Sequence, residues 1–148
     1  MAPLDPRRIC QIALVVRDIE KTARQYAEIF GMPMPKIFSI PPVEEAHTTF
    51  RGKLTKTRAR LAVFDLGSVV LELTQPDDEP SSWKEFLDTR GEGVHHIGFM
   101  VDDLDATLDF MAKKGMPERH SGDYPGGRYV FVESAEQLGV LLNVKHEA

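Results

Sequence analysis

The sequence predicts an α+β protein in which two similar modules share one core. The first observation is an internal repeat at an offset of 85 residues, which places residues 11–13 over 96–98 and residues 18–20 over 103–105. Second, each copy reads as a short apolar strand, an acidic residue and then apolar residues at helical spacing. Third, two strand-like segments follow each helix, so the predicted order is β-α-β-β, twice.

A strand and a helix open the first module. The strand covers residues 8–16, and Asp18 suits the helix N-cap because a carboxylate there accepts free backbone N–H groups. Gly31 suits the left-handed position that ends the helix. The apolar residues at helical spacing are Ile19, Ala23, Tyr26, Ala27 and Phe30. Two strands are then predicted, from Ala59 to Leu66 and from Ser68 to Thr74.

The second module repeats this order after a linker. Its strand covers residues 93–101, its helix runs between Asp103 and Gly115, and its later strands cover 128–133 and 139–145. In the linker, a short helix is predicted where Ser82 and Glu85 have the spacing of a capping box. One extra strand in each half is expected, without a firm position.

Length favours a single domain that contains both modules. A chain of 148 residues buries roughly 68–70% of its unfolded surface. Neither half is expected to cover both faces of its sheet alone. We therefore expect one domain over residues 1–148, with module one at about 8–76, a linker at 77–92 and module two at about 93–146.

Composition limits the partners and the location. A net charge of −5 disfavours nucleic acid, because binding phosphates requires a basic field. No apolar run approaches the roughly 18 residues of a membrane span, and the start of the chain lacks the apolar core of a secretory signal. Cys10 is the only cysteine, which excludes an internal disulfide and suits a reducing cytoplasm. A cytoplasmic protein with no membrane or nucleic-acid partner is predicted.

Alternation along the first strand of each module assigns side chains to two faces. The bulky apolar residues should pack under the helices, and His95 falls on that face. The opposite face pairs Gln11 with Ala13 and His96 with Gly98. A polar group with space beside it is what a cavity wall requires.

Two further polar residues interrupt apolar strands in matched positions. Glu72 lies within VVLELTQP and Asn143 within GVLLNVKH. Glutamate is rarely buried without a partner. If the modules close into a cup, these two residues would converge with Gln11 and His96. The four side chains would then form either a metal site or a hydrogen-bonded polar cluster.

Three segments, GVHHIGFMVDDLD, LGSVVLELTQP and LGVLLNV, resemble the vicinal oxygen chelate superfamily, which includes glyoxalase I, methylmalonyl-CoA epimerase, extradiol dioxygenases and the bleomycin and fosfomycin resistance proteins. The resemblance covers residues 8–146 and is nearest to the epimerase-like branch. It implies two paired βαβββ modules that form a cupped mixed sheet with the helices outside. It also implies a homodimer and a divalent metal on the floor of the cup, held as a rule by two His and two carboxylate or Gln residues.

Position by position, the resemblance gives a metal set of Gln11, Glu72, His96 and Asn143. His96 and Glu72 match the family pattern, whereas Gln11 stands in place of a histidine and Asn143 in place of a glutamate. One carboxylate leaves a divalent ion underneutralised. Amide oxygens suit Mg, Mn or Ca better than Zn or Ni. A divalent metal (Mg, Mn, Co, Ni or Zn) and its absence both remain open, and no organic cofactor is predicted.

The predicted activity is that of an isomerase, epimerase or lyase acting on a small oxygenated substrate through an enolate-like intermediate. Glu72 and His96 are the predicted catalytic residues, because the amide of Asn143 cannot take a proton near neutral pH. Glu44, Glu45 and His47 are second choices for the base. The alternative is a small-molecule binder of the antibiotic-resistance type, without metal or chemistry. Ring-cleaving dioxygenase activity is disfavoured, because only one of the two family histidines is present.

Four residues outside this set are predicted to bind substrate. Arg58 and Arg60, with Lys53, would attract an anionic group such as a phosphate or carboxylate. Tyr124 and Arg128 lie in DYPGGRYVF, which is read as the approach to a hairpin at the rim of the pocket. The substrate itself is not predicted by any of these residues.

Overall fold

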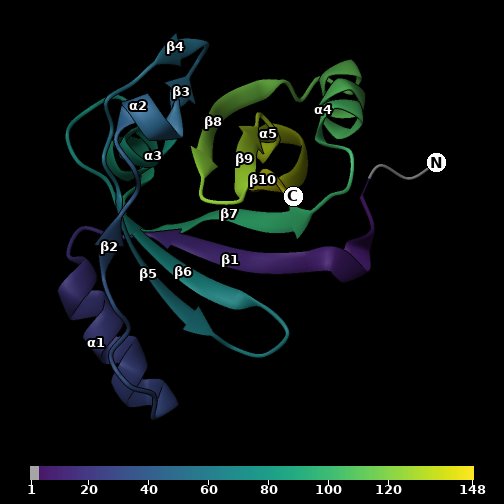
Figure 1. Cartoon of the computed structure of the whole chain (residues 1–148). Helices are drawn as coiled ribbons and strands as arrows, with labels where there is room; N and C mark the ends of the chain where they lie inside the picture. Colours follow the sequence, from purple (N-terminus) through teal and green to yellow (C-terminus); the bar gives the residue numbers. More distant parts are fainter. Residues whose placement is uncertain (1–3) are drawn as a thin grey trace.

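The computed structural model describes residues 4–148, which form one curled mixed sheet of ten strands with helices outside it (Figure 1). The order across the sheet is β2-β5-β6-β1-β7-β10-β9-β8-β3-β4. The strands are β1 (Ile9–Val15), β2 (Phe38–Ser39), β3 (Thr49–Phe50), β4 (Lys53–Leu54), β5 (Arg60–Asp65), β6 (Val70–Gln75), β7 (Gly93–Met100), β8 (Glu118–Tyr124), β9 (Gly127–Val132) and β10 (Leu141–Glu147). The helices are the 3-10 turn η1 (Pro6–Arg8), α1 (Ile19–Phe30), α2 (Val43–Ala46), α3 (Ser82–Arg90), α4 (Leu104–Lys113) and α5 (Ala135–Leu138).

The two modules meet at β1 and β7, which pair antiparallel in the middle of the sheet with Ile12 opposite Ile97. On the outer side of each, the last strand of the same module pairs in parallel, β6 with β1 and β10 with β7. The predicted repeat and fold class are confirmed. The expected extra strand of each half is β2 in the first module and β8 in the second, each antiparallel to the next strand of its module.

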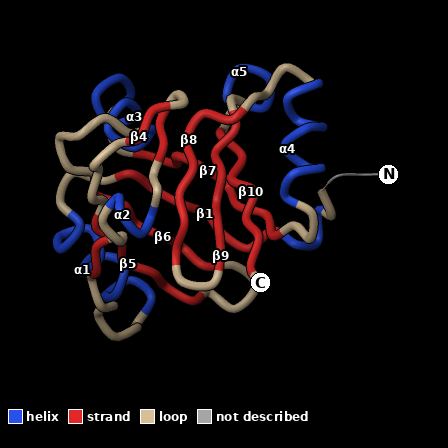
Figure 2. The backbone as a smooth tube through the Cα atoms, turned by 45° about the horizontal axis from the view of Figure 1, so that its top comes forward, coloured by secondary structure: helices blue, strands red, loops and turns tan. Residues whose placement is uncertain are grey.

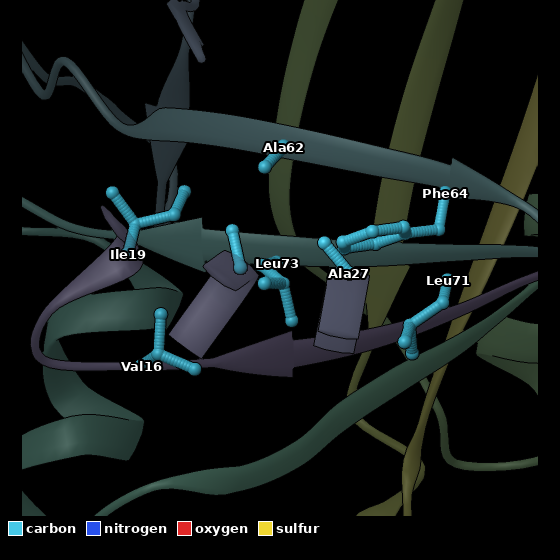
Figure 3. Packing of buried hydrophobic residues seen from close by; sticks show 8 residues of the cluster. Val16, Ile19, Ala27, Ala62, Phe64, Leu71 and Leu73 are labelled. Carbon is cyan, nitrogen blue, oxygen red and sulfur yellow. The ribbon is translucent and has the colours of Figure 1, made fainter. Parts of the chain in front are cut away.

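Helix α1 covers the outer face of the first half, and α4 covers that of the second half (Figure 1). Under α1 lies a cluster of buried apolar side chains (Figure 3), which includes Val16, Ile19, Ala23, Ala27, Ala62, Phe64, Leu71 and Leu73. The helix begins where predicted, because Asp18 Oδ1 accepts the backbone N–H of Lys21 at 3.2 Å. It ends at Gly31, whose φ of 63° is the left-handed conformation that glycine adopts most readily.

Helix α4 packs on a separate apolar cluster, which includes Val101, Met111, Met116, Val130, Val132, Leu142 and Val144. Its N-cap is Asp103, as predicted, with Oδ1 accepting the N–H of Ala106 at 3.0 Å. In the linker helix α3 the cap is Ser81, whose Oγ accepts the N–H of Lys84 at 2.9 Å. The predicted capping box at Ser82 and Glu85 is therefore wrong: the cap lies one residue earlier, and Lys84 at the third helical position cannot accept a backbone N–H in return.

The long connection between β2 and β5 crosses from the first module to the far edge of the second. It carries α2 and the β3–β4 hairpin, and β3 pairs antiparallel with β8 (Figure 2). This pairing was not predicted from the sequence, because β3 and β4 contain only two residues each. The crossing segment therefore adds two short strands of the first module to the edge of the second half.

A β-bulge in β7 overturns one face assignment. Ala13 lies opposite His96 and Leu14 lies opposite Val94, so His95 is an extra residue with no partner on β1. A bulge breaks the strict alternation of side chains. His95 consequently contacts α3 and Phe131 on the concave side instead of packing under α4.

No helix within residues 4–148 is long and apolar enough to cross a membrane.

Candidate functional site

A cavity of about 250 Å³ lies on the concave face of the sheet and is lined by strands of both modules. Its lining residues are Gln11, Phe38, Ile40, Pro41, Ala46, Leu61, Glu72, Trp83, His96, Asp123, Tyr124, Pro125, Tyr129, Phe131, Asn143 and Lys145. A wider hollow of about 510 Å³ beside α4 is lined by charged and apolar residues of η1, α4 and the end of β7, and by none of the four polar residues predicted to converge. The smaller cavity is the candidate site, because apolar walls with a few converging polar groups are typical of ligand pockets.

The four residues predicted to converge meet at this cavity. Gln11 Nε2 donates to Glu72 Oε2 at 2.6 Å. Gln11 Oε1 lies 2.9 Å from His96 Nε2 and accepts from Asn143 Nδ2 at 3.0 Å. The amide of Gln11 is therefore the centre of the cluster, with the other three side chains arranged around it.

The backbone beside this cluster leaves room for Gln11. Gly98 lies opposite Gln11 across the β1–β7 pair and beside Asn143 on β10. A Cβ atom at Gly98 would lie 3.0 Å from Gln11 Cβ and 3.1 Å from Gln11 Oε1. A side chain at this position would therefore crowd the Gln11 amide and force it to shift by a few tenths of an ångström. The small residue predicted beside the polar group is thus required by the packing of Gln11.

Glu72 is the acidic group of the cavity. Burial raises its pKa above the ordinary value, and the nearby charge of Lys145 and the hydrogen bonds from Thr74 and Gln11 lower it in part. Its side chain is only partly covered by protein and reaches the cavity. The surrounding protein removes most water from the carboxylate, but the carboxylate still faces the cavity. A carboxyl group with a raised pKa that faces a cavity is suited to acid–base chemistry.

His96 is buried and neutral. Its pKa is well below the ordinary value, first because of burial and then because of the neighbouring charges of His95 and Lys145. Its ring packs on Phe131 with centroids 4.5 Å apart. A neutral imidazole carries one N–H, so His96 can donate one hydrogen bond and accept one.

These four residues, as arranged, do not fit a tightly held divalent ion. Gln11 Oε1 already accepts two hydrogen bonds, and His96 Nε2 is engaged with that same oxygen. Asn143 Oδ1 is the only polar atom of the cluster that is buried without a partner. Nowhere in residues 4–148 do three or more His, Cys, Asp or Glu side chains come together as a metal-binding group. The arrangement favours the hydrogen-bonded cluster over the metal site, the two alternatives that the sequence left open.

We expect divalent ions to leave the folding of this protein unchanged. A bound ion stabilises a protein in proportion to its affinity for the folded state, and two neutral amides with one carboxylate are a weak set for any such ion. Thermal unfolding should shift by less than about 1 °C when Mg²⁺, Mn²⁺ or Zn²⁺ is added at tenfold excess over protein, on the scale where 1 kcal/mol moves Tm by a few degrees. A shift of several degrees that Glu72→Gln removes would contradict this prediction.

Of the residues predicted to bind substrate, Tyr124 lines the cavity. Arg60 pairs with Glu20 on α1, on the outer side of the sheet. Arg58 donates to the carbonyl of Ile40 at 2.8 Å. Like Arg60 and Lys53, it is not among the lining residues. The same holds for Arg128, which is exposed, and the structure therefore brings none of these basic residues to the cavity.

The second-choice bases lie at the crossing segment. Glu44 and Glu45 are exposed on α2. His47 Nδ1 lies 2.9 Å from Asp123 Oδ2, and Asp123 lines the cavity. These residues are therefore remote from the polar cluster or reach it only through Asp123.

Lys145 is the cavity residue that sequence reasoning missed. It lies two positions after Asn143 on β10, so alternation places both side chains on the concave face. The ammonium group lies 5.0 Å from the centre of the Tyr124 ring. The same alternation that selected Asn143 could have found it.

A family model described as the glyoxalase, bleomycin resistance protein and dioxygenase superfamily matches residues 10–131. The chain belongs to this superfamily. Its βαβββ modules and its cupped sheet are those expected of the vicinal oxygen chelate fold. The cavity on the concave face is thus the place where the superfamily resemblance put the site.

Among relatives, 4-hydroxyphenylpyruvate dioxygenase of Legionella pneumophila (strain Corby) is 28% identical over 100 residues, which are 67% of this chain and 26% of that protein. The chain therefore spans about a quarter of that dioxygenase. The structure of methylmalonyl-CoA epimerase from Mycobacterium tuberculosis has a TM-score of 0.68 at 20% identity and covers 98% of this chain and 93% of that one. A methylmalonyl-CoA epimerase in complex with methylmalonyl-CoA and NH4+ has a TM-score of 0.66 at 25% identity, with 96% and 95% covered. The predicted resemblance to the epimerase-like branch is confirmed.

Proposed function

We propose that this superfamily member is an isomerase or epimerase that moves a proton at a carbon next to a carbonyl group, with Glu72 as the acid–base residue. The observation that carries the proposal is the Glu72 carboxylate, which reaches the cavity and has a raised pKa. Enzymes raise the pKa of a glutamate in this way when it must both take and return a proton. The epimerase relatives support the same class of reaction.

Glu72 would take the proton from the carbon next to the carbonyl. The negative charge then develops on the carbonyl oxygen, and a preorganised cation or N–H group nearby lowers the energy of that enolate. Lys145 supplies an ammonium group in the same cavity, and Asn143 Nδ2 retains a second N–H beyond the one given to Gln11. A proton returned to the same face would regenerate the starting compound, so epimerisation requires the planar enolate to turn its other face to protonated Glu72 before the proton returns. No step of this mechanism requires a metal ion.

The cavity accommodates the reacting part of a substrate. Its volume of about 250 Å³ is just below the range of roughly 300–1,000 Å³ for pockets that hold drug-sized ligands. Trp83, Tyr129 and Phe131 provide an aromatic wall. A small acid or the acyl end of a thioester would fit, and the rest of a larger substrate would extend outside. The lyase reading uses the same proton abstraction and differs only in the fate of the enolate.

The alternative is a binding protein without chemistry, which the two amides in the polar cluster favour. Exchange of a carbon-bound proton distinguishes the enzyme from the binding protein, because a binding protein holds its ligand without exchanging the ligand's protons.

The homodimer and the cytoplasmic location remain predictions from the sequence.

The proposal is tested by incubating the protein in D2O with methylmalonyl-CoA and with a set of small 2-oxo and 2-hydroxy acids. We expect deuterium to appear at the carbon next to the carbonyl of at least one compound, at least 100-fold faster than without protein, a typical gain from a positioned acid–base residue. Proton NMR measures the exchange, and saturation transfer in the same tube measures binding. A compound that binds at the cavity without exchange would support the binder, and no exchange across the set would contradict the proposal.

A further inference from the structure

A row of buried hydrogen bonds leads from the candidate catalytic carboxylate to a helix outside the cavity. From Glu72 it passes to Gln11 at 2.6 Å and from Gln11 to His96 at 2.9 Å. It continues from His96 Nδ1 to His95 Nδ1 at 2.8 Å and from His95 Nε2 to Ser82 Oγ at 3.0 Å. The two histidines and Ser82 are each about 1% exposed. The row joins β6, β1, β7 and α3, and His95 and Ser82 do not line the cavity.

The chemistry of the groups gives this row one direction. Gln11 donates its Nε2–H to the carboxylate and accepts from Asn143, so its oxygen faces His96. A carbonyl oxygen only accepts, and His96 must therefore carry its proton on Nε2. Its Nδ1 is then bare and faces the Nδ1 of His95. Two ring nitrogens 2.8 Å apart share one proton, so His95 carries its proton on Nδ1. The remaining Nε2 of His95 is bare and accepts from the hydroxyl of Ser82.

Both imidazoles are held in the neutral form that this direction requires. Burial lowers the pKa of His95 to about 3 and lowers the pKa of His96 well below the ordinary value. The His95 ring lies edge-on to Phe86 and Phe131, with centroids 5.4 and 5.0 Å away. These aromatic neighbours offer no hydrogen-bond partner that would compete for its nitrogens. Each histidine therefore has one N–H and one lone pair, which is what a directed row needs.

The hydroxyl group of Ser82 is not needed to cap its helix. The N-cap of α3 is Ser81, and the Ser82 hydroxyl makes no capping bond. Its recorded partner is His95, the residue that the β-bulge in β7 turns toward α3. The bulge and the hydroxyl are two separate features that meet at the same imidazole.

We propose that Ser82 and His95 are positioning residues, which fix the proton of His96 on Nε2 and so hold the Gln11 amide with its N–H toward Glu72. If His96 instead carried its proton on Nδ1, its bare Nε2 would attract the Gln11 amide nitrogen. The amide would then rotate, and its oxygen would face the carboxylate. The consequence for catalysis rests on the proposed function, whereas the proton positions do not.

Long-range proton–nitrogen NMR of protein labelled with ¹⁵N-histidine tests the proposal, because the two tautomers of a neutral imidazole give different correlation patterns. In the full-length wild-type chain we expect His96 as the Nε2–H tautomer and His95 as the Nδ1–H tautomer. In Ser82→Ala we expect both rings to show mixed tautomers, and deuterium exchange at the substrate carbon to fall about tenfold with a displaced pH profile. Ser82→Thr, which keeps the hydroxyl, should restore both readouts.

The matched control is Ser81→Ala, which removes the neighbouring hydroxyl and the cap bond to Lys84. It should lower the melting temperature and leave both tautomers unchanged. Should Ser82→Ala fail to fold, Ser82→Cys keeps the size of the side chain with a weaker donor and should give the mixed tautomers instead. An Nδ1–H tautomer for His96 in the wild type, or unchanged tautomers in folded Ser82→Ala or Ser82→Cys, would overturn the proposal. The expected tautomers without turnover on any compound would support the positioning row and overturn the proposed function.

Discussion

Glu72→Gln is expected to make the protein more stable, with a gain that grows as pH rises. The pKa of Glu72 is higher in the folded state than in the unfolded state. The contribution of this group to the free energy of unfolding is therefore fully present below pH about 4.5, and it is lost as pH rises through the folded-state pKa. At pH 8 the wild type therefore bears the cost of a desolvated carboxylate. A glutamine can accept from Gln11 and donate to Thr74 without that charge. The gain should be about 1–3 kcal/mol, the usual size of a buried-charge effect.

Urea unfolding at pH 5 and pH 8 measures this difference. Glu28→Gln is the matched control, because Glu28 is exposed on α1 and its substitution should change stability equally at both pH values. If Glu72→Gln were destabilising at pH 8, the carboxylate would be a net stabilising group and the raised pKa would be wrong. A catalytic group that costs stability in this way is the expected trade-off at an active site.

Acid is expected to unfold the protein well above the pH range in which exposed carboxylates are protonated. Three buried histidines, His95, His96 and His120, have pKa values lowered mainly by burial, that of His95 to about 3. A base with a lowered folded-state pKa contributes stability above pH about 6.5, which is lost as pH falls toward the folded-state value. Three such groups give a slope of about 4 kcal/mol per pH unit. Glu72 has a raised pKa and therefore the opposite sign, so it offsets part of this uptake.

The number of protons taken up on unfolding between pH 5 and pH 6 checks this prediction. We expect an uptake of two to three protons, obtained from the slope of the unfolding free energy against pH. This number reflects uptake by the three buried histidines and the opposing effect of Glu72. His120→Gln should reduce this uptake by about one proton. A flat stability between pH 5 and pH 7 would mean that the buried histidines are charged in the folded state.

Alternation and the internal repeat were sufficient to predict that four polar side chains converge at the candidate cavity. They placed Gln11, Glu72, His96 and Asn143 on matched strands, and the structure joins all four by hydrogen bonds. The prediction succeeded because strand pairing transmits the repeat directly into space: β1 and β7 lie side by side, and the last strand of each module flanks them.

The features that alternation could not predict are those that break it or lie off the strands. The bulge that turns His95 depends on how β7 pairs with β1, and no residue type in GVHHIG marks it. Arg60 was predicted to bind substrate because of its charge, but in the structure it forms an ion pair with Glu20 of α1 on the outer face of the sheet. The capping serine of α3 shifted from Ser82 to Ser81, because two adjacent serines carry the same signal. Tertiary contacts decide such cases, and a single sequence does not contain them.

The most direct test of the account is deuterium exchange at the substrate carbon by Glu72→Gln beside the wild type, with the compound that the wild type exchanges fastest. Saturation transfer first establishes that the variant binds this compound. We expect exchange slowed at least 100-fold in the bound variant, with Glu28→Gln at the wild-type rate. Exchange at an undiminished rate in Glu72→Gln would show that another group moves the proton, and the role assigned to the carboxylate on the cavity wall would be wrong.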